Sequence, residues 1–195
     1  MNTNRSDPYL LLGAFHPATN ELNVVVETPK GSRNKYEYDR ELGLFKLGGL
    51  LPAGANFPFD FGFVPSTLGE DGDPLDVLVL MDEPAFPGCL VSSRLIGVIE
   101  AEQTERDGET VRNDRLIAVA MKSLSHRDLT SLDQLQPNGA GSTGASILLE
   151  EIEHFFISYN RFKSKEFKPI GRFGPDRAEQ LIEQGIDRMK TNPRD

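Results

Sequence analysis

An acidic turn directly before an apolar run constrains the fold of this chain most strongly. Residues 71–76 read Asp-Gly-Asp-Pro-Leu-Asp, and residues 77–80 are Val-Leu-Val-Leu. Because Gly72 and Pro74 disfavour a helix and favour a turn, the three aspartates can point into one small volume. Clustered carboxylates raise each other's pKa unless a cation lies among them. Oxygen ligands suit Mg²⁺ or Ca²⁺, and Mn²⁺ nearly as well, so the segment predicts a divalent-cation site at the start of a strand.

Two other interpretations of this segment were weighed. An ordinary acidic surface turn explains it equally well when it is taken alone. An EF-hand loop fits poorly, because its fifth, sixth and twelfth positions need an oxygen ligand, Gly and Glu. Those positions hold Leu75, Asp76 and Asp82.

Composition limits the class of protein and its partners. The 195 residues, 38% of them hydrophobic, suit a single domain that spans 1–195, with a barrel at about 23–120 and a helical part at about 130–190. One cysteine, Cys89, excludes an intrachain disulfide and favours a cytoplasmic location. A net charge of −9 and no long apolar run argue against nucleic-acid and membrane partners. An anionic substrate would therefore need a local cluster of cations, for which bound metal ions are one source.

Short β-branched or apolar runs dominate the first two-thirds of the chain. The expected strands lie at 23–27, 35–39, 77–80, 90–99 (two strands or one bent one) and 115–120. Residues 57–63 carry Phe at every second position and predict an extended segment with an aromatic face. Residues 100–114 are polar and predict an exposed hairpin loop. Five to seven short strands indicate a closed barrel.

The last third of the chain has helical periodicity. A helix is expected at about 146–163, with an apolar stripe at Leu148, Ile152, Phe155, Tyr159 and Phe162. A second helix is expected at about 175–190, with Ala178, Leu181, Ile182, Ile186 and Met189 on its inner face. Leu132–Leu135 is expected to be a short helix. The fold class is thus α+β, mainly β.

Taken together, these segments resemble the family I soluble inorganic pyrophosphatases. The acidic motif at 71–76 with its apolar strand carries the resemblance, supported by the Lys35/Glu37 pair, residues 58–63 and the helix that bears Tyr159. The likeness extends from about residue 23 to about residue 175. It implies a five-stranded OB-like closed barrel with two main flanking helices, and hydrolysis of pyrophosphate to two phosphates with several Mg²⁺ ions, which Mn²⁺ could replace. Bacterial members are usually homo-oligomers, often hexamers, so a homo-oligomer is expected.

The resemblance also implies roles for single residues. Asp71 and Asp76 would be metal ligands, and Asp73 would accept a proton from the attacking water. The family's later metal-binding Asp is either replaced by Asn113 or displaced to Asp114. Another would fall on Asp107 or Gln103, between which the sequence does not decide. On the substrate side, the residues implied are Glu27 and Glu37 (through metal-bound waters), Lys35, Arg115 and Tyr159.

Several family positions differ in this chain. An Arg falls at Gly49, two Tyr at Phe57 and Phe61, and a Lys at Asn160, while an Asp-x-Lys falls at 113–115. Candidate replacements for the missing cations are Lys30, Arg33, Lys46, Arg115, Arg161 and Lys163, of which only Arg115 aligns with a family binding position. Two alternatives therefore stay open: a phosphohydrolase with another phosphate substrate, and a non-catalytic module on the same barrel.

Overall fold

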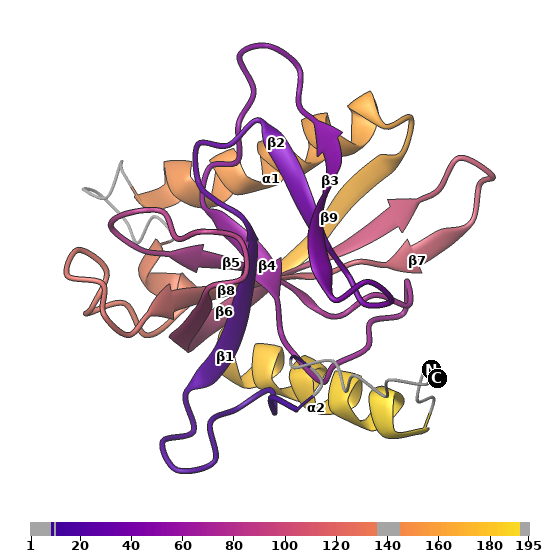
Figure 1. Cartoon of the computed structure of the whole chain (residues 1–195). Coiled ribbons are helices and arrows are strands. Elements are labelled where there is room, and N and C mark those ends of the chain that lie inside the picture. Colours follow the sequence, from indigo (N-terminus) through magenta and orange to yellow (C-terminus); the bar gives the residue numbers. More distant parts are fainter. Residues whose placement is uncertain (1–8, 10, 136–144, 192–195) are drawn as a thin grey trace.

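Five strands form a closed ring at the centre of the molecule. The computed structural model describes residues 9, 11–135 and 145–191 (Figure 1). The ring runs in the order β1-β4-β5-β8-β6 and closes because β6 also pairs with β1. All neighbours are antiparallel except β5 and β8, which are parallel. This confirms the predicted five-stranded barrel. The ring strands are β1 (Leu22–Thr28), β4 (Asp60–Phe63), β5 (Asp76–Leu80), β6 (Leu90–Thr104) and β8 (Arg115–Ala120).

Two glycines and a bulge shape the ring. A Cβ on Gly62 would lie 2.1 Å from the carbonyl oxygen of Val25, so β1 and β4 can approach each other only at a glycine. Between Val26 and Thr28 the register of this pair shifts, which leaves Glu27 as the extra residue of a β-bulge. A second shift, next to Gly97, bends the long strand β6, so the segment expected as two strands or one bent one is one bent strand.

The sequence pattern did not reveal the extension of β6 or strand β9. Strand β6 continues to Thr104, where a loop was expected, and pairs there with β7 (Thr110–Arg112) and β9 (Glu166–Phe173). The polar residues of this extension are paired within the protein rather than solvated: Glu100 is buried and binds Arg112 and Arg177 at 2.7 and 2.6 Å. Strand β9 was not expected at all. Strand β3 (Leu44–Leu50), which follows the Lys35/Glu37 pair, forms a separate two-stranded sheet with β2 (Asn34–Asp39).

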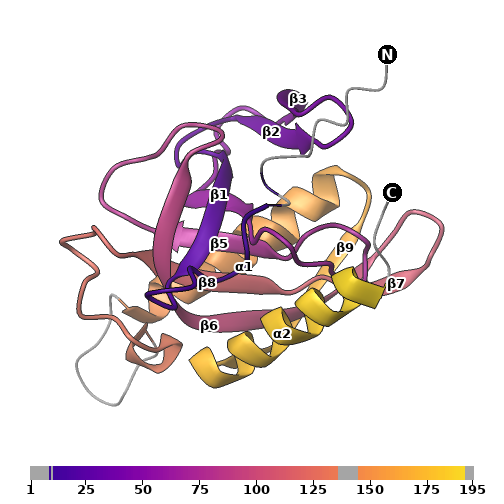
Figure 2. The same ribbon diagram turned by 60° about the horizontal axis from the view of Figure 1, so that its bottom comes forward.

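Two helices cover two separate hydrophobic cores. Helix α1 (Ala145–Phe162) buries Leu149, Ile152 and Phe156 in a core with the aromatic segment, and η1 (Leu132–Leu135) joins it. Helix α2 (Pro175–Thr191) lies across β6 (Figure 2) and buries Ala178, Leu181 and Ile182 in the other core. Burial of each large apolar side chain contributes about 1.5–3 kcal/mol.

The inner face of α1 differs from the predicted stripe at one end. Phe162 is 64% exposed, whereas Phe155 and Tyr159 are partly buried against the core, and Tyr159 also lines a cavity. Within the described residues, neither helix has the length and apolar character needed to cross a membrane.

Candidate active site

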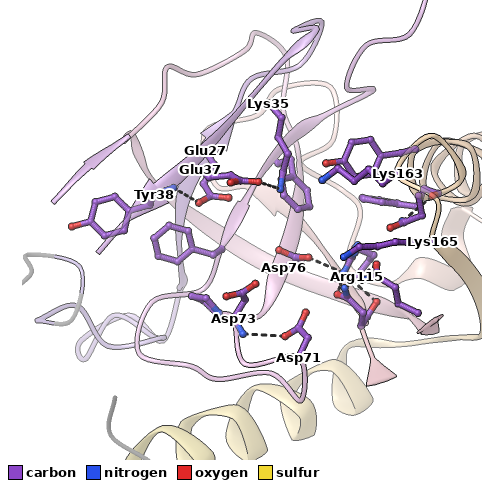
Figure 3. A pocket seen from close by; sticks show the side chains of 18 of the residues that line it. Glu27, Lys35, Glu37, Tyr38, Asp71, Asp73, Asp76, Arg115, Lys163 and Lys165 are labelled. Carbon is purple, nitrogen blue, oxygen red and sulfur yellow. Dashed lines mark hydrogen bonds and ion pairs between the residues drawn. The ribbon is translucent and has the colours of Figure 1, made fainter. Parts of the chain in front are cut away.

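One cavity gathers most of the residues that the sequence singled out. It measures about 560 Å³ and lies between the β2–β3 hairpin, the acidic turn and the end of α1 (Figure 3). Its wall carries equal numbers of acidic and basic side chains, although the whole chain has a net charge of −9. The acidic ones are Glu27, Glu37, Asp71, Asp73, Asp76 and Glu105, and the basic ones are Lys35, Arg40, Lys46, Arg115, Lys163 and Lys165.

The acidic turn has the conformation that its glycine and proline predict. Gly72 adopts φ +85°, a left-handed conformation that favours glycine. The Asp73 N–H donates to Asp71 Oδ1 at 3.1 Å, and the Gly69 N–H donates to the Asp73 carbonyl at 2.7 Å. The pKa of Asp71 is raised to about 6, first by burial of its carboxylate and then by Asp76, although the residue as a whole is exposed at the mouth of the cavity. The turn therefore concentrates negative charge at the mouth.

Strand pairing places Asp76 beside Arg115. These residues begin β5 and β8, whose parallel register matches Val77 with Leu116. Arg115 Nη1 lies 2.8 Å from Asp76 Oδ2, and the Arg115 side chain is only 5% exposed. Burial raises the pKa of Asp76, and Arg115 opposes that rise.

The buried guanidinium of Arg115 is held on three sides. It stacks on Phe156 and Phe167, at 4.7 and 5.2 Å from the ring centroids, which are distances of cation–π contact. It also donates to the Oδ1 and the carbonyl oxygen of Asn113. Its Nε is buried without a hydrogen-bond partner among the described residues. Arg115 is therefore a fixed cation in the wall, with its buried Nε donor still unused.

The bulge in β1 turns Glu27 into the cavity. The Tyr38 N–H donates to Glu27 Oε1 at 2.8 Å, yet burial raises the pKa of Glu27 to about 7. Nearby, Lys35 binds Glu37 at 2.7 Å. Burial disfavours the charged form of Lys35, but Tyr159 and Glu37 outweigh it, so the pKa of Lys35 lies above its ordinary value. Strand β1 thus contributes the Glu27 carboxylate to the wall, and strand β2 contributes the Lys35–Glu37 ion pair.

Tyr159 presents a buried hydroxyl without a partner. Its ring stacks on Phe155, with the centroids 5.8 Å apart, and lies 5.9 Å from Phe57. Its Oη has no hydrogen-bond partner in the part of the chain that the structure describes, and burial raises the pKa of the phenol. Buried hydroxyls in proteins normally form a hydrogen bond, so the Tyr159 hydroxyl is suited to donate one to an oxygen atom of a ligand. Packing alone, the other interpretation of this residue, does not require the hydroxyl.

The structure separates the remaining metal-ligand candidates. Gln103 lines the cavity, whereas Asp107 is exposed in the β6–β7 turn, where its Oδ1 accepts from the Glu109 N–H at 3.1 Å. Asp114 also lies off the cavity wall and binds Arg112 at 2.8 Å. The structure therefore keeps Asp107 away from the acidic turn, whereas Asp114 lies with Asp71 and Asp76 on the wall of a smaller adjoining cavity of about 140 Å³.

An amide network lies beside Arg115 on the wall of the larger cavity. Asn113 Nδ2 donates to Gln103 Oε1 at 3.2 Å, and Gln103 Nε2 donates to Glu105 Oε1 at 2.6 Å. Glu105 in turn binds Lys165 Nζ at 2.6 Å. The network connects Arg115 to Lys165 across the floor of the cavity.

Some residues of the wall were missed or misjudged from the sequence. Glu105, Lys165 and Arg40 line the wall but carry no signal in the sequence, because each lies in a polar segment without a motif. Of the six cations weighed as replacements, the wall includes Lys46, Arg115 and Lys163, but not Lys30, Arg33 or Arg161. Asn160 reaches the cavity as a neutral residue, and its Nδ2 donates to the Phe156 carbonyl at 2.9 Å.

The donor set fits a hard divalent cation that also binds a ligand. No three His, Cys, Asp or Glu side chains among the described residues are close enough to hold an ion by themselves. Mg²⁺ does not need such a cage, because it is commonly bound by one or two carboxylates, water and substrate phosphates. Asp71 and Asp76 place two carboxylates with raised pKa values at the same cavity. A cation bound between them would stabilise their ionised forms and lower both pKa values.

Comparison with known proteins agrees with this geometry. A family model described as "Inorganic pyrophosphatase" matches residues 24–190. The chain is 36% identical to an inorganic pyrophosphatase of Nostoc over 174 residues, which cover 89% of this chain and 95% of the relative. It is 36% identical to soluble inorganic pyrophosphatase 2 of Chlamydomonas reinhardtii over 93% of this chain and 88% of that one. The crystal structure of the Thermus thermophilus inorganic pyrophosphatase superposes with a TM-score of 0.78 at 34% identity, covering 92% of this chain and 97% of that one. The chain belongs to the inorganic pyrophosphatase family.

Proposed function

We propose that this protein hydrolyses inorganic pyrophosphate to two phosphates in a Mg²⁺-dependent reaction, in which Mn²⁺ can replace Mg²⁺. The observation that carries the proposal is the Asp76–Arg115 ion pair, which joins the acidic turn to the cationic wall of one cavity. A tetra-anionic substrate needs both metal ligands and cations within reach, and this cavity provides both.

Asp71 and Asp76 would hold the metal. When bound, the ion supplies positive charge that neutralises the substrate and acidifies water. Asp73 would take the proton from the attacking water, because no ion pair or hydrogen bond to a described residue engages its carboxylate at the cavity mouth.

The substrate oxygens would meet the opposite wall. Lys35 and Arg115 would bind phosphate oxygens by charge, and the Tyr159 hydroxyl would donate to one. Glu27 and Glu37 would accept hydrogen bonds from waters in the cavity and so keep them oriented.

Phosphate release from pyrophosphate with Mg²⁺, with and without EDTA, tests the reaction. Asp73→Asn should lower kcat about 10²- to 10⁴-fold, because it removes the proton acceptor. Asp128→Asn, on an aspartate whose side chain is 94% exposed, is the matched control and should leave kcat unchanged. A wild-type protein that releases no phosphate, or an Asp73→Asn variant with normal turnover, would contradict the proposal.

A second candidate is a phosphohydrolase for a different phosphate compound. It is favoured by the neutral character of Phe57, Phe61 and Asn160 on the wall, which give no charged contact to phosphate. A panel of pyrophosphate, a nucleoside triphosphate and a phosphomonoester separates the two: a large preference for pyrophosphate eliminates the second candidate. Turnover of any of them excludes a purely binding module.

We also propose a cytoplasmic homo-oligomer, on the basis of family membership and the lone Cys89. Sedimentation velocity of the purified protein measures its assembly state. A monomer at micromolar concentration would rule out the oligomer.

A further inference from the structure

Lys163 is a cation of the wall without an acidic partner. Its neighbours on the wall are paired: Lys35 with Glu37, and Lys165 with Glu105. Within the described residues, no carboxylate lies at ion-pair distance from Lys163, whose Nζ instead lies over the Tyr159 ring, 4.5 Å from the centroid.

The backbone around Lys163 is fixed by the turn that ends α1. The Lys163 N–H donates to the Asn160 carbonyl at 2.9 Å, and Ser164 adopts φ +58°. From the β6–β7 hairpin, Arg106 Nε donates to the Lys163 carbonyl at 2.9 Å. These contacts hold the chain so that Lys163 reaches the cavity on the side of Arg115 and Lys165, across from Glu27 and Tyr38 (Figure 3).

The charges around Lys163 favour an anion next to it. Burial and the nearby Lys35 lower the pKa of Lys163 to about 8, and Lys165 acts in the same direction. Glu37 and Asp76 act in the opposite direction without cancelling this effect. An anion bound beside Lys163 and Lys35 would relieve the repulsion between the two ammonium groups and keep both charged.

The Tyr159 hydroxyl, which has no hydrogen-bond partner among the described residues, lies in the same part of the cavity as Lys163. Tyr159 lies beneath Lys163, and its Oη is, with Arg115 Nε, one of two buried side-chain donors without a hydrogen-bond partner among the described residues. Asn160, the adjacent residue, is 97% buried and neutral, and its amide already binds the helix backbone. Of the two lysines that follow Tyr159 and line the cavity, Lys165 is paired with Glu105, so Lys163 is the one whose charge is available to a ligand at this hydroxyl.

We propose that Lys163 binds a phosphoryl oxygen of the substrate, at a subsite formed with Lys35 and the Tyr159 hydroxyl. This assignment rests on the proposed function, since it names which residues grip one phosphate of pyrophosphate. The competing explanation is structural: a lysine after a helix end interacts favourably with the helix dipole and needs no ligand.

Three variants separate these explanations. Lys163→Met removes the charge and keeps the apolar stem, Lys163→Arg restores the charge, and Lys168→Met is the control. Lys168 lies on β9, is 66% exposed and does not line the cavity. Lys168→Met therefore changes the net charge by the same amount as Lys163→Met, but away from the cavity. We expect KM for Mg²⁺-pyrophosphate to rise about tenfold in Lys163→Met, to stay within about threefold in Lys163→Arg, and to be unchanged in Lys168→Met.

A binding measurement keeps the test independent of turnover. Titration calorimetry with inorganic phosphate and Mg²⁺ should show about tenfold weaker binding in Lys163→Met than in the wild type. If the wild type binds phosphate but does not hydrolyse pyrophosphate, the proposed function fails, and the calorimetric comparison still decides the role of Lys163. Equal KM and equal phosphate affinity in wild type and Lys163→Met would overturn the inference while leaving the proposed function intact.

Thermal unfolding controls for damage to the fold. Similar Tm values for the variants assign a change in KM to the lost contact. If Lys163→Met melts early, Lys163→Gln takes its place, since it keeps a polar side chain without charge. A lowered Tm with unchanged phosphate binding in Lys163→Gln would establish the structural explanation and refute ours.

Discussion

Arg115 Nη1 lies 2.8 Å from Asp76 Oδ2, and the two residues begin neighbouring parallel strands. In metal-free protein this guanidinium is the main neutralising charge on Asp76. Arg115→Met should therefore lower the free energy of unfolding by roughly 2–4 kcal/mol, because it leaves a largely buried carboxylate unpaired. Urea unfolding in EDTA measures the change.

A double-mutant cycle provides the control for this ion pair. Asp76→Asn combined with Arg115→Met should cost less than the sum of the two single changes, because the second substitution removes the unpaired charge. Strict additivity would show that the ion pair does not couple the two residues.

Glu27 should make metal-free protein less stable as the pH rises. Its pKa in the folded state is about 7, above that of an ordinary glutamate, so the folded protein holds this proton more tightly than the unfolded chain. The resulting stabilisation is complete below about pH 4.5 and is lost as the pH rises to about 7. Tm measured in EDTA across this range should fall. Glu27→Gln should flatten the curve only in part, because burial also raises the pKa values of Asp60, Asp71, Asp76 and Asp114. The exposed Glu41→Gln should leave the curve unchanged.

Tyr159→Phe distinguishes packing from substrate binding. The ring contacts with Phe57 and Phe155 do not involve the hydroxyl, and removing a buried hydroxyl without a partner costs no hydrogen bond. We expect Tm to stay the same or rise slightly, while KM for pyrophosphate rises several-fold. Unchanged kinetics would mean that Tyr159 serves only the packing of α1.

Substitution by alanine should change the stability much more at Gly62 than at Gly49. A Cβ on Gly62 would meet the Val25 carbonyl oxygen at 2.1 Å, so Gly62→Ala must push β1 and β4 apart and should destabilise the protein by roughly 3 kcal/mol or more. A Cβ on Gly49, in β3, would meet nothing within 4 Å, so Gly49→Ala should change the stability by less than about 1 kcal/mol. Urea unfolding of both variants checks the contrast, and equal losses would contradict it.

Features set by neighbouring residues were predictable from the sequence, whereas contacts between segments far apart in the chain were not. The acidic turn, its following strand and the two helices depend on glycine, proline and apolar periodicity, which act over a few residues. The extension of β6 was hidden because Glu100 looks solvated in the sequence and is in fact buried between two arginines. For the same reason Lys163 was weighed mainly as a surface charge: only the turn after α1, held by Arg106, brings it to the cavity.

The parallel pairing of β5 and β8 also sets an order of assembly. All of β6 and β7 lies between Asp76 and Arg115 in the chain, so the two cannot meet until that long crossover has formed. Closing such a loop costs entropy that local contacts do not repay, which makes it a late event. During refolding from denaturant, catalytic competence should therefore return after the far-ultraviolet circular dichroism signal, and an activity assay would time the final step of folding.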